Sequence, residues 1–146
     1  MDEARHDSES PFLEMLGTRV EEWRDGYVRI ALDLKPHHLN CAGVVHGGVL
    51  ATLLDHAGGF CGLYCTKPGN RRYGMTLSLT TNFIAQSRGG RLTAIGQRTT
   101  AGRRIYFTQT EVRDEAGTVL ATGTSVHRFR SGSESPEGVP PRSRQA

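Results

Sequence analysis

The sequence predicts a single α+β domain in which one antiparallel sheet covers one long helix. A run from about Gly47 to Tyr64 carries apolar residues at helical spacing. Two strand-like segments precede this run and four follow it, and within each group short turns containing glycine separate them. The chain has 146 residues, which is enough for one domain with its own core.

The first elements are a short helix and a hairpin. Residues Pro11 to Gly17 include four large apolar side chains, which is enough for one short helix. Asp25-Gly26 predicts a tight turn between strands at Thr18 to Arg24 and Tyr27 to Leu34. In the second strand Val28, Ile30, Leu32 and Leu34 alternate with Arg29, Ala31 and Asp33, which is typical of a strand with one wet face.

The long helix has two different faces. Its apolar face holds Leu50, Leu53, Leu54, Ala57, Phe60, Cys61 and Tyr64. The opposite face holds Gly48, Thr52, Asp55 and Gly59, which are small residues around one carboxylate. We expect another element to pack closely on this second face.

Four strands follow the helix, and we expect them to form a meander in which each strand pairs with the next. Their predicted ranges are Tyr73 to Ala85, Arg91 to Thr100, Arg104 to Asp114 and Thr118 to Arg130. Residues 1–10 and 131–146 are rich in polar residues, and we predict that both are flexible tails. The folded domain is therefore expected to span residues 11–130.

Composition narrows the class of partner and the compartment. The net charge is +3, but the basic residues are scattered over several turns, which argues against a nucleic-acid surface. A phosphorylated small molecule needs only two or three of them. The three cysteines form no disulfide or metal pattern, and no segment resembles a signal peptide or membrane span. We expect a cytoplasmic protein that binds neither metal, cofactor nor membrane.

The long helix also carries the candidate chemistry. Gly47-Gly48 opens it with free backbone N–H groups that suit an oxyanion, and Asp55 supplies a carboxylate. Eight residues of helix separate Gly47 from Asp55 by roughly 12 Å, which is too far for one reacting carbonyl. Two antiparallel helices related by a two-fold axis would bring Gly47 of one chain beside Asp55 of the other. The sequence therefore predicts a homodimer with composite sites.

These residues resemble those of the hotdog-fold acyl-CoA thioesterases, in the phenylacetate-pathway branch of the 4-hydroxybenzoyl-CoA thioesterase superfamily. The resemblance covers about Pro11 to Phe129. Its strongest part is Asn40, Gly43, His46-Gly47-Gly48 and Asp55 at the family's spacing, with Gly74-Met75-Thr76 in the next strand. It implies a hotdog fold, in which a curved antiparallel sheet wraps a central helix, and a dimer or a dimer of dimers.

The resemblance also implies a role for each site residue. Asp55 matches the catalytic carboxylate, which either polarises water or attacks the thioester itself. Gly47 matches the oxyanion donor, Asn40 a side chain that holds the carbonyl or the water, and Thr76 a hydroxyl near the nucleophile. For His46 we prefer a structural role at the turn to that of a general base. The candidate substrate-binding residues are Gly48, Arg88, Arg91, Arg103 and Arg104.

The expected activity is hydrolysis of an acyl-CoA to CoA and a carboxylic acid, with a medium-chain, aryl or arylacetyl group as the acyl portion. Two alternatives remain open. One is a non-catalytic module that senses acyl-CoA, although the carboxylate is present and no DNA-binding segment is appended. The other is a hotdog enoyl-CoA hydratase or dehydratase, although the proline-rich histidine loop of that family is missing.

Overall fold

The computed structural model describes residues 10–142, and nearly all of the predicted N-terminal tail, residues 1–9, lies outside them. Two helices, a short 3-10 helix and six strands make up this part of the chain. In chain order they are α1 (Pro11–Leu16), β1 (Arg19–Arg24), β2 (Tyr27–Asp33), η3 (Pro36–His38), α2 (Gly47–Cys61), β3 (Gly74–Phe83), β4 (Arg91–Ala101), β5 (Ile105–Arg113) and β6 (Val119–Phe129). The predicted α+β class and element order are confirmed.

The six strands form one antiparallel sheet in the order β1-β2-β4-β5-β6-β3. The predicted meander is therefore correct for β4, β5 and β6 and wrong for β3, which pairs with β6 instead of β4. The link from β3 to β4 is too long for a tight turn. Its first amides, those of Ile84 and Ala85, bond to the Leu120 carbonyl, and the Ser87 carbonyl accepts from the amide of Val45, in the loop before α2. The link therefore crosses the end of the sheet.

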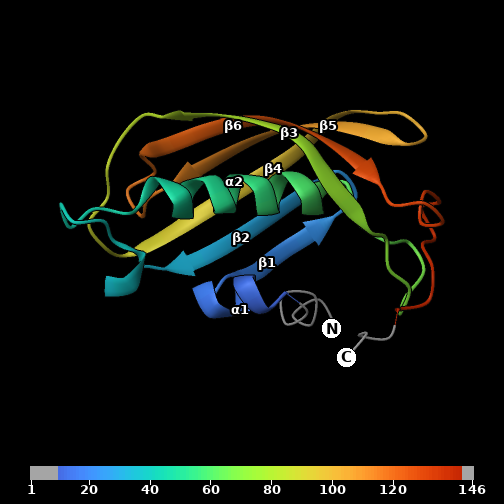
Figure 1. The fold of residues 1–146 in the computed structure, drawn as a ribbon, viewed down its shortest axis with the longest axis horizontal. Coiled ribbons are helices and arrows are strands. Elements are labelled where there is room, and N and C mark those ends of the chain that lie inside the picture. Colours follow the sequence, from blue (N-terminus) through green and yellow to red (C-terminus); the bar gives the residue numbers. More distant parts are fainter. Residues whose placement is uncertain (1–9, 143–146) are drawn as a thin grey trace.

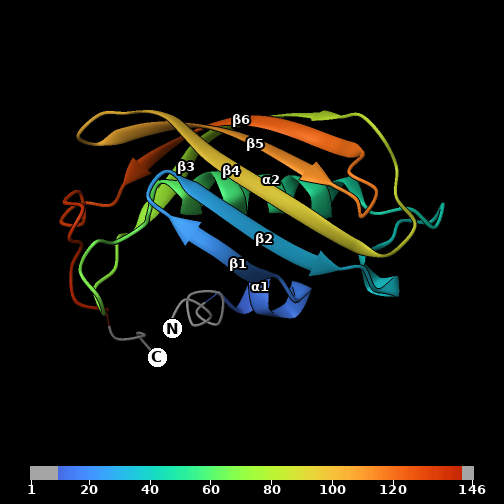
Figure 2. The ribbon, with the colours of Figure 1, turned by 180° about the vertical axis from the view of Figure 1, so that it is seen from behind.

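The curved sheet wraps α2, which lies in front of the strands in Figure 1 and behind them in Figure 2. Leu53, Leu54, Ala57 and Cys61 are fully buried between the helix and the sheet. At β4 the helix comes so close that a side chain on Gly96 would overlap the Ala57 carbonyl. Burial in the core raises the pKa of the Cys61 thiol to about 12, so this cysteine is a protonated core residue.

The helix ends at Cys61, three residues before the predicted Tyr64. Gly62 terminates it, since its amide bonds to the carbonyls of Gly59 and Phe60. The ring of Tyr106 occupies the space that a side chain on Gly62 would need. Leu63 and Tyr64 therefore follow the loop towards β3.

The segment after β6 makes defined contacts within its described part, residues 131–142. Ser133 is buried, and its hydroxyl oxygen accepts from the Tyr73 amide at 3.0 Å. The Arg72 guanidinium donates to the Glu134 carbonyl at 2.6 Å. These bonds attach the start of the segment to the loop before β3, while the flexibility predicted for it stays a prediction.

Candidate functional site

Asp55 and Thr76 meet beside the polar face of α2. The Thr76 hydroxyl donates to a carboxylate oxygen of Asp55 at 2.6 Å. Thr76 lies on β3 next to an irregularity in the β3–β6 register between Thr76 and Ser78. Bulges of this kind often redirect a side chain near a functional site. The structure therefore brings together two predicted site residues that are 21 positions apart in the sequence.

Behind Thr76 lies His127, which the sequence reasoning missed. The two residues face each other across the β3–β6 pair, and Nδ1 of His127 is 3.3 Å from the Thr76 hydroxyl oxygen. His127 is 1% exposed, and burial lowers its pKa while the nearby Asp55 charge partly opposes that shift. Alternation along β6 places Ser125 and His127 on the inner, apolar face. Polar residues at these inward-facing positions of β6 are the sequence signal that could have identified His127.

The other predicted residues gather at the start of α2. Nδ1 of His46 accepts from the Gly48 amide at 2.8 Å, and the His46 carbonyl accepts from Val49 and Leu50. Within residues 10–142 no acceptor reaches the Gly47 amide. His46 thus caps the helix, as a structural role requires, and leaves the Gly47 N–H available to a ligand.

The loop before α2 contains Asn40. Its side-chain oxygen accepts from the amides of Ala42 and Val44 at 2.9 and 3.3 Å, so that oxygen shapes the loop. Arg88 donates to the Ala42 carbonyl at 3.1 Å and therefore lies over the same loop. The ring of Phe83, at the end of β3, covers Gly47.

The structure does not bring the remaining arginines to this loop. Arg91 is ion-paired with Asp33 at 2.8 Å and with Glu21 at 3.4 Å. Arg103 and Arg104 lie in the β4–β5 turn, and Arg103 lines a cavity with Arg72 and Glu134 at the other end of α2. The predicted substrate-binding set is therefore divided between the two ends of the helix.

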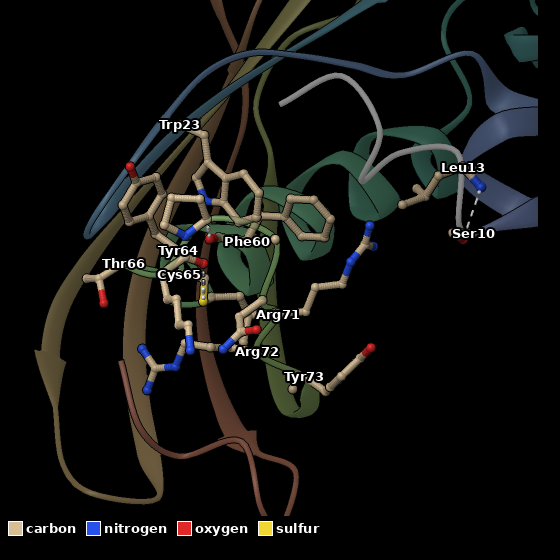
Figure 3. Close-up of a pocket in the computed structure, with 16 residues that line it drawn as sticks. Ser10, Leu13, Trp23, Phe60, Tyr64, Cys65, Thr66, Arg71, Arg72 and Tyr73 are labelled. Atoms are coloured by element: carbon tan, nitrogen blue, oxygen red, sulfur yellow. Dashed lines mark hydrogen bonds between the residues drawn. The ribbon is translucent and has the colours of Figure 1, made fainter. Parts of the chain in front are cut away.

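A cavity of about 460 Å³ opens beside Asp55, and Thr76, Met75, Leu79 and His127 line part of it. A larger cavity of about 870 Å³ adjoins it. The residues that line both cavities are Ser10, Leu13, Phe60, Leu63 and Gly74. Figure 3 shows this larger cavity, with Trp23, Phe60 and Tyr64 along one side and Arg71, Arg72 and Tyr73 along the other. An apolar space thus extends from the carboxylate towards an aromatic cluster.

The helices within residues 10–142 are too short or too polar to span a membrane. No group of three or more His, Cys, Asp or Glu in that range is placed to hold a metal ion.

The chain matches the family model described as "Thioesterase superfamily" over residues 42–121. A curated relative, the medium/long-chain acyl-CoA thioesterase YigI of Salmonella typhimurium, is 24% identical over 133 residues, covering 80% of this chain and 84% of that protein. A conserved protein from Pseudomonas aeruginosa has a similar structure, with a TM-score of 0.76, 26% identity and coverage of 87% and 99% of the two chains. A mutant form of the phenylacetic acid degradation protein PaaI from Thermus thermophilus gives a TM-score of 0.70, 26% identity and coverage of 82% and 98%.

Proposed function

We propose that this member of the thioesterase superfamily, an acyl-CoA thioesterase, acts on medium-chain, aryl or arylacetyl-CoA thioesters. The products are CoA and the free carboxylic acid. The observation that carries the proposal is the hydrogen bond from Thr76 to Asp55 at the wall of an apolar cavity. In the larger cavity beyond it, the rings of Trp23 and Phe60 stack with their centroids 5.2 Å apart. Apolar and aromatic side chains of this kind are the lining that such acyl groups need.

We propose that Asp55 acts as a general base. Thr76 donates to one carboxylate oxygen, which leaves the other to accept a proton from water. The resulting hydroxide attacks the thioester carbon, and the carbonyl oxygen becomes an oxyanion that the Gly47 N–H stabilises. Collapse of this intermediate breaks the carbon–sulfur bond, and the proton held by Asp55 passes to the CoA thiolate.

The two halves of this site lie apart in one chain, which supports a composite site in a homodimer. Gly47 and Asp55 are separated by eight residues of α2, or roughly 12 Å along the axis. One midpoint between them is Ala51, so two α2 helices packed antiparallel about Ala51 would place each Gly47 beside the Asp55 of the other chain. The small, partly exposed residues Gly48, Thr52 and Gly59 allow such close packing.

Strand β3 offers the matching contact. It lies at the end of the sheet, and its side chains Met75, Leu77 and Phe83 are 43%, 51% and 58% exposed. A ten-residue edge strand with exposed apolar side chains is a template for pairing with another strand. Antiparallel pairing about the middle of β3 would set the Thr76 end of one strand beside the Phe83 end of its partner. Since Phe83 covers Gly47, this pairing joins the same two half-sites.

The proposal is tested by Asp55→Asn, which keeps the side-chain shape and removes the base. We expect thiol release from a panel of acyl-CoA esters to fall by about 10²–10⁴-fold, with the dimer intact. The matched control is Asp114→Asn, since the Asp114 carboxylate accepts from the Thr118 amide in the β5–β6 turn, where an asparagine side chain can accept too. Unchanged turnover in Asp55→Asn would remove this carboxylate from the reaction.

A further inference from the structure

We propose that His127 is a positioning residue that acts through Thr76 to hold the Asp55 carboxylate in its working orientation. The inference rests on the proposed function of Asp55. It follows from a chain of hydrogen bonds that runs from β5 through β6 and β3 to α2, with His127 at its centre.

This chain of hydrogen bonds joins five residues. Three hydrogen bonds precede the one from Thr76 to Asp55. The hydroxyl oxygens of Thr108 and Ser125 are 2.5 Å apart, and the Ser125 oxygen is 2.7 Å from Nε2 of His127. Nδ1 of His127 is 3.3 Å from the Thr76 oxygen. The strand register sets this arrangement, because Thr108 faces Ser125 across β5 and β6, and His127 faces Thr76 across β6 and β3.

Counting the available protons shows which atom donates in each of these hydrogen bonds. An ionised carboxylate only accepts, so the single proton of the Thr76 hydroxyl is committed to Asp55. The Thr76 oxygen must then accept from His127, which requires the proton to be on Nδ1. Burial favours the neutral ring, so Nε2 is an acceptor and Ser125 donates to it. Every donor from Thr108 onward therefore points towards Asp55.

The surroundings of His127 hold it in place. Thr108, Ser125 and His127 are 2%, 3% and 1% exposed, so water does not compete for these bonds. The Tyr106 ring stacks on the imidazole with centroids 5.0 Å apart, and the Tyr106 hydroxyl donates to the Gly59 carbonyl of α2 at 2.7 Å. The imidazole of His127 therefore packs against a β5 side chain that is itself hydrogen-bonded to α2, the helix that carries Asp55.

Gly58 provides the room for this chain. A Cβ on Gly58 would lie 2.5 Å from the Ser125 hydroxyl, 2.9 Å from that of Thr108 and 3.0 Å from Nε2 of His127. Three polar atoms thus meet the helix backbone at one residue that has no side chain. The helix turn between Asp55 and Gly59 therefore lies directly on the hydrogen-bonded chain.

The catalytic test compares His127→Leu with His127→Asn. Leucine fills much of the space without hydrogen bonds, whereas the asparagine amide can still donate near the Nδ1 position. We expect kcat to fall by about tenfold in His127→Leu with little change in KM, and to recover in part in His127→Asn. The control is Thr110→Val, since Thr110 is buried on β5 two residues from Thr108 and its hydroxyl has no partner within residues 10–142.

Nitrogen NMR of the imidazole gives a readout that does not depend on turnover. We expect the neutral Nδ1–H tautomer in the wild-type protein and a shifted Nδ1 signal in Thr76→Val. An Nε2–H tautomer, or equal kcat in His127→Leu and Thr110→Val, would overturn the inference. If instead Asp55→Asn keeps full activity, the proposed function fails, and the NMR result still decides whether the hydrogen-bonded chain exists.

Discussion

The Thr76 hydroxyl and the Asp55 carboxylate are joined by a 2.6 Å hydrogen bond that connects the edge strand β3 to the middle of α2. This bond ties the carboxylate to the strand whose outer edge is open. Pairing of β3 with a second copy of the chain would therefore bear directly on Asp55. The candidate site and the proposed dimer contact therefore both depend on β3.

The backbone N–H of Gly47 can be removed without disturbing the helix. Proline is favoured at the first helical position, and His46 before it already has φ −65° and ψ 135°, which proline allows in its preceding residue. We expect Gly47→Pro to lower kcat by about 10²–10³-fold because the oxyanion loses its donor. Gly47→Ala keeps the N–H, and its Cβ would make an ordinary 3.5 Å contact with Phe83, so it should stay near wild type. Equal rates for the two variants would exclude this donor.

A charge at the open edge of β3 tests the proposed interface. We expect Leu77→Glu to convert the proposed dimer to a monomer of 16.0 kDa and to lower thiol release in parallel, because the pairing edge then repels its copy. Light scattering measures the mass. Phe107→Glu is the control, since Phe107 is 46% exposed on β5, within the sheet. A fully active Leu77→Glu monomer would contradict the composite site.

Stability should fall in mildly acidic solution because of two buried histidines. Burial lowers the pKa values of His38 and His127 below their ordinary 6.5, so between the lowered values and 6.5 the unfolded chain binds more protons than the folded one. The contribution of these two neutral histidines to the free energy of unfolding is therefore complete above pH 6.5 and is lost as the pH decreases below it. We expect the free energy of unfolding in urea to be lower at about pH 5.5 than at about pH 7.5.

Variants identify the groups responsible for that pH dependence. The difference between the two pH values should shrink in His127→Leu and in His38→Leu, because each lacks one group that charges on unfolding. The lowered carboxyl pKa values of Asp25 and Asp33 act below their ordinary 3.8 and stay outside this window. The same difference in both variants as in wild type would show that other groups cause it.

Most elements could be predicted from local sequence, because their signals are local. The Asp25-Gly26 turn, the alternation from Val28 to Leu32 and the helical spacing after Gly47 each depend on neighbouring residues. The pairing of β3 with β6 does not. It depends on where the link after Phe83 bonds, namely to Leu120, and no local pattern contains that information.

In the candidate site too, some residues could be predicted from local sequence and others depend on how the strands pair. Gly47 and Asp55 could be chosen from the sequence of the helix, and Asn40 from its resemblance to the family motif. His127 enters the site only through its register opposite Thr76. Its inward position was readable from alternation along β6, but its neighbour on β3 was not. The use of the Asn40 side-chain oxygen within its own loop also depends on atomic geometry that spacing alone does not reveal.

Mixing two inactive variants tests most directly whether Gly47 and Asp55 of different chains form one site. Asp55→Asn and Gly47→Pro protomers, tagged differently and co-expressed, would form mixed dimers with one intact site and one doubly altered site. Random pairing then predicts about a quarter of wild-type thiol release from a mixture whose parents are both inactive. If both residues serve the site from the same chain, the mixture will be as inactive as its parents.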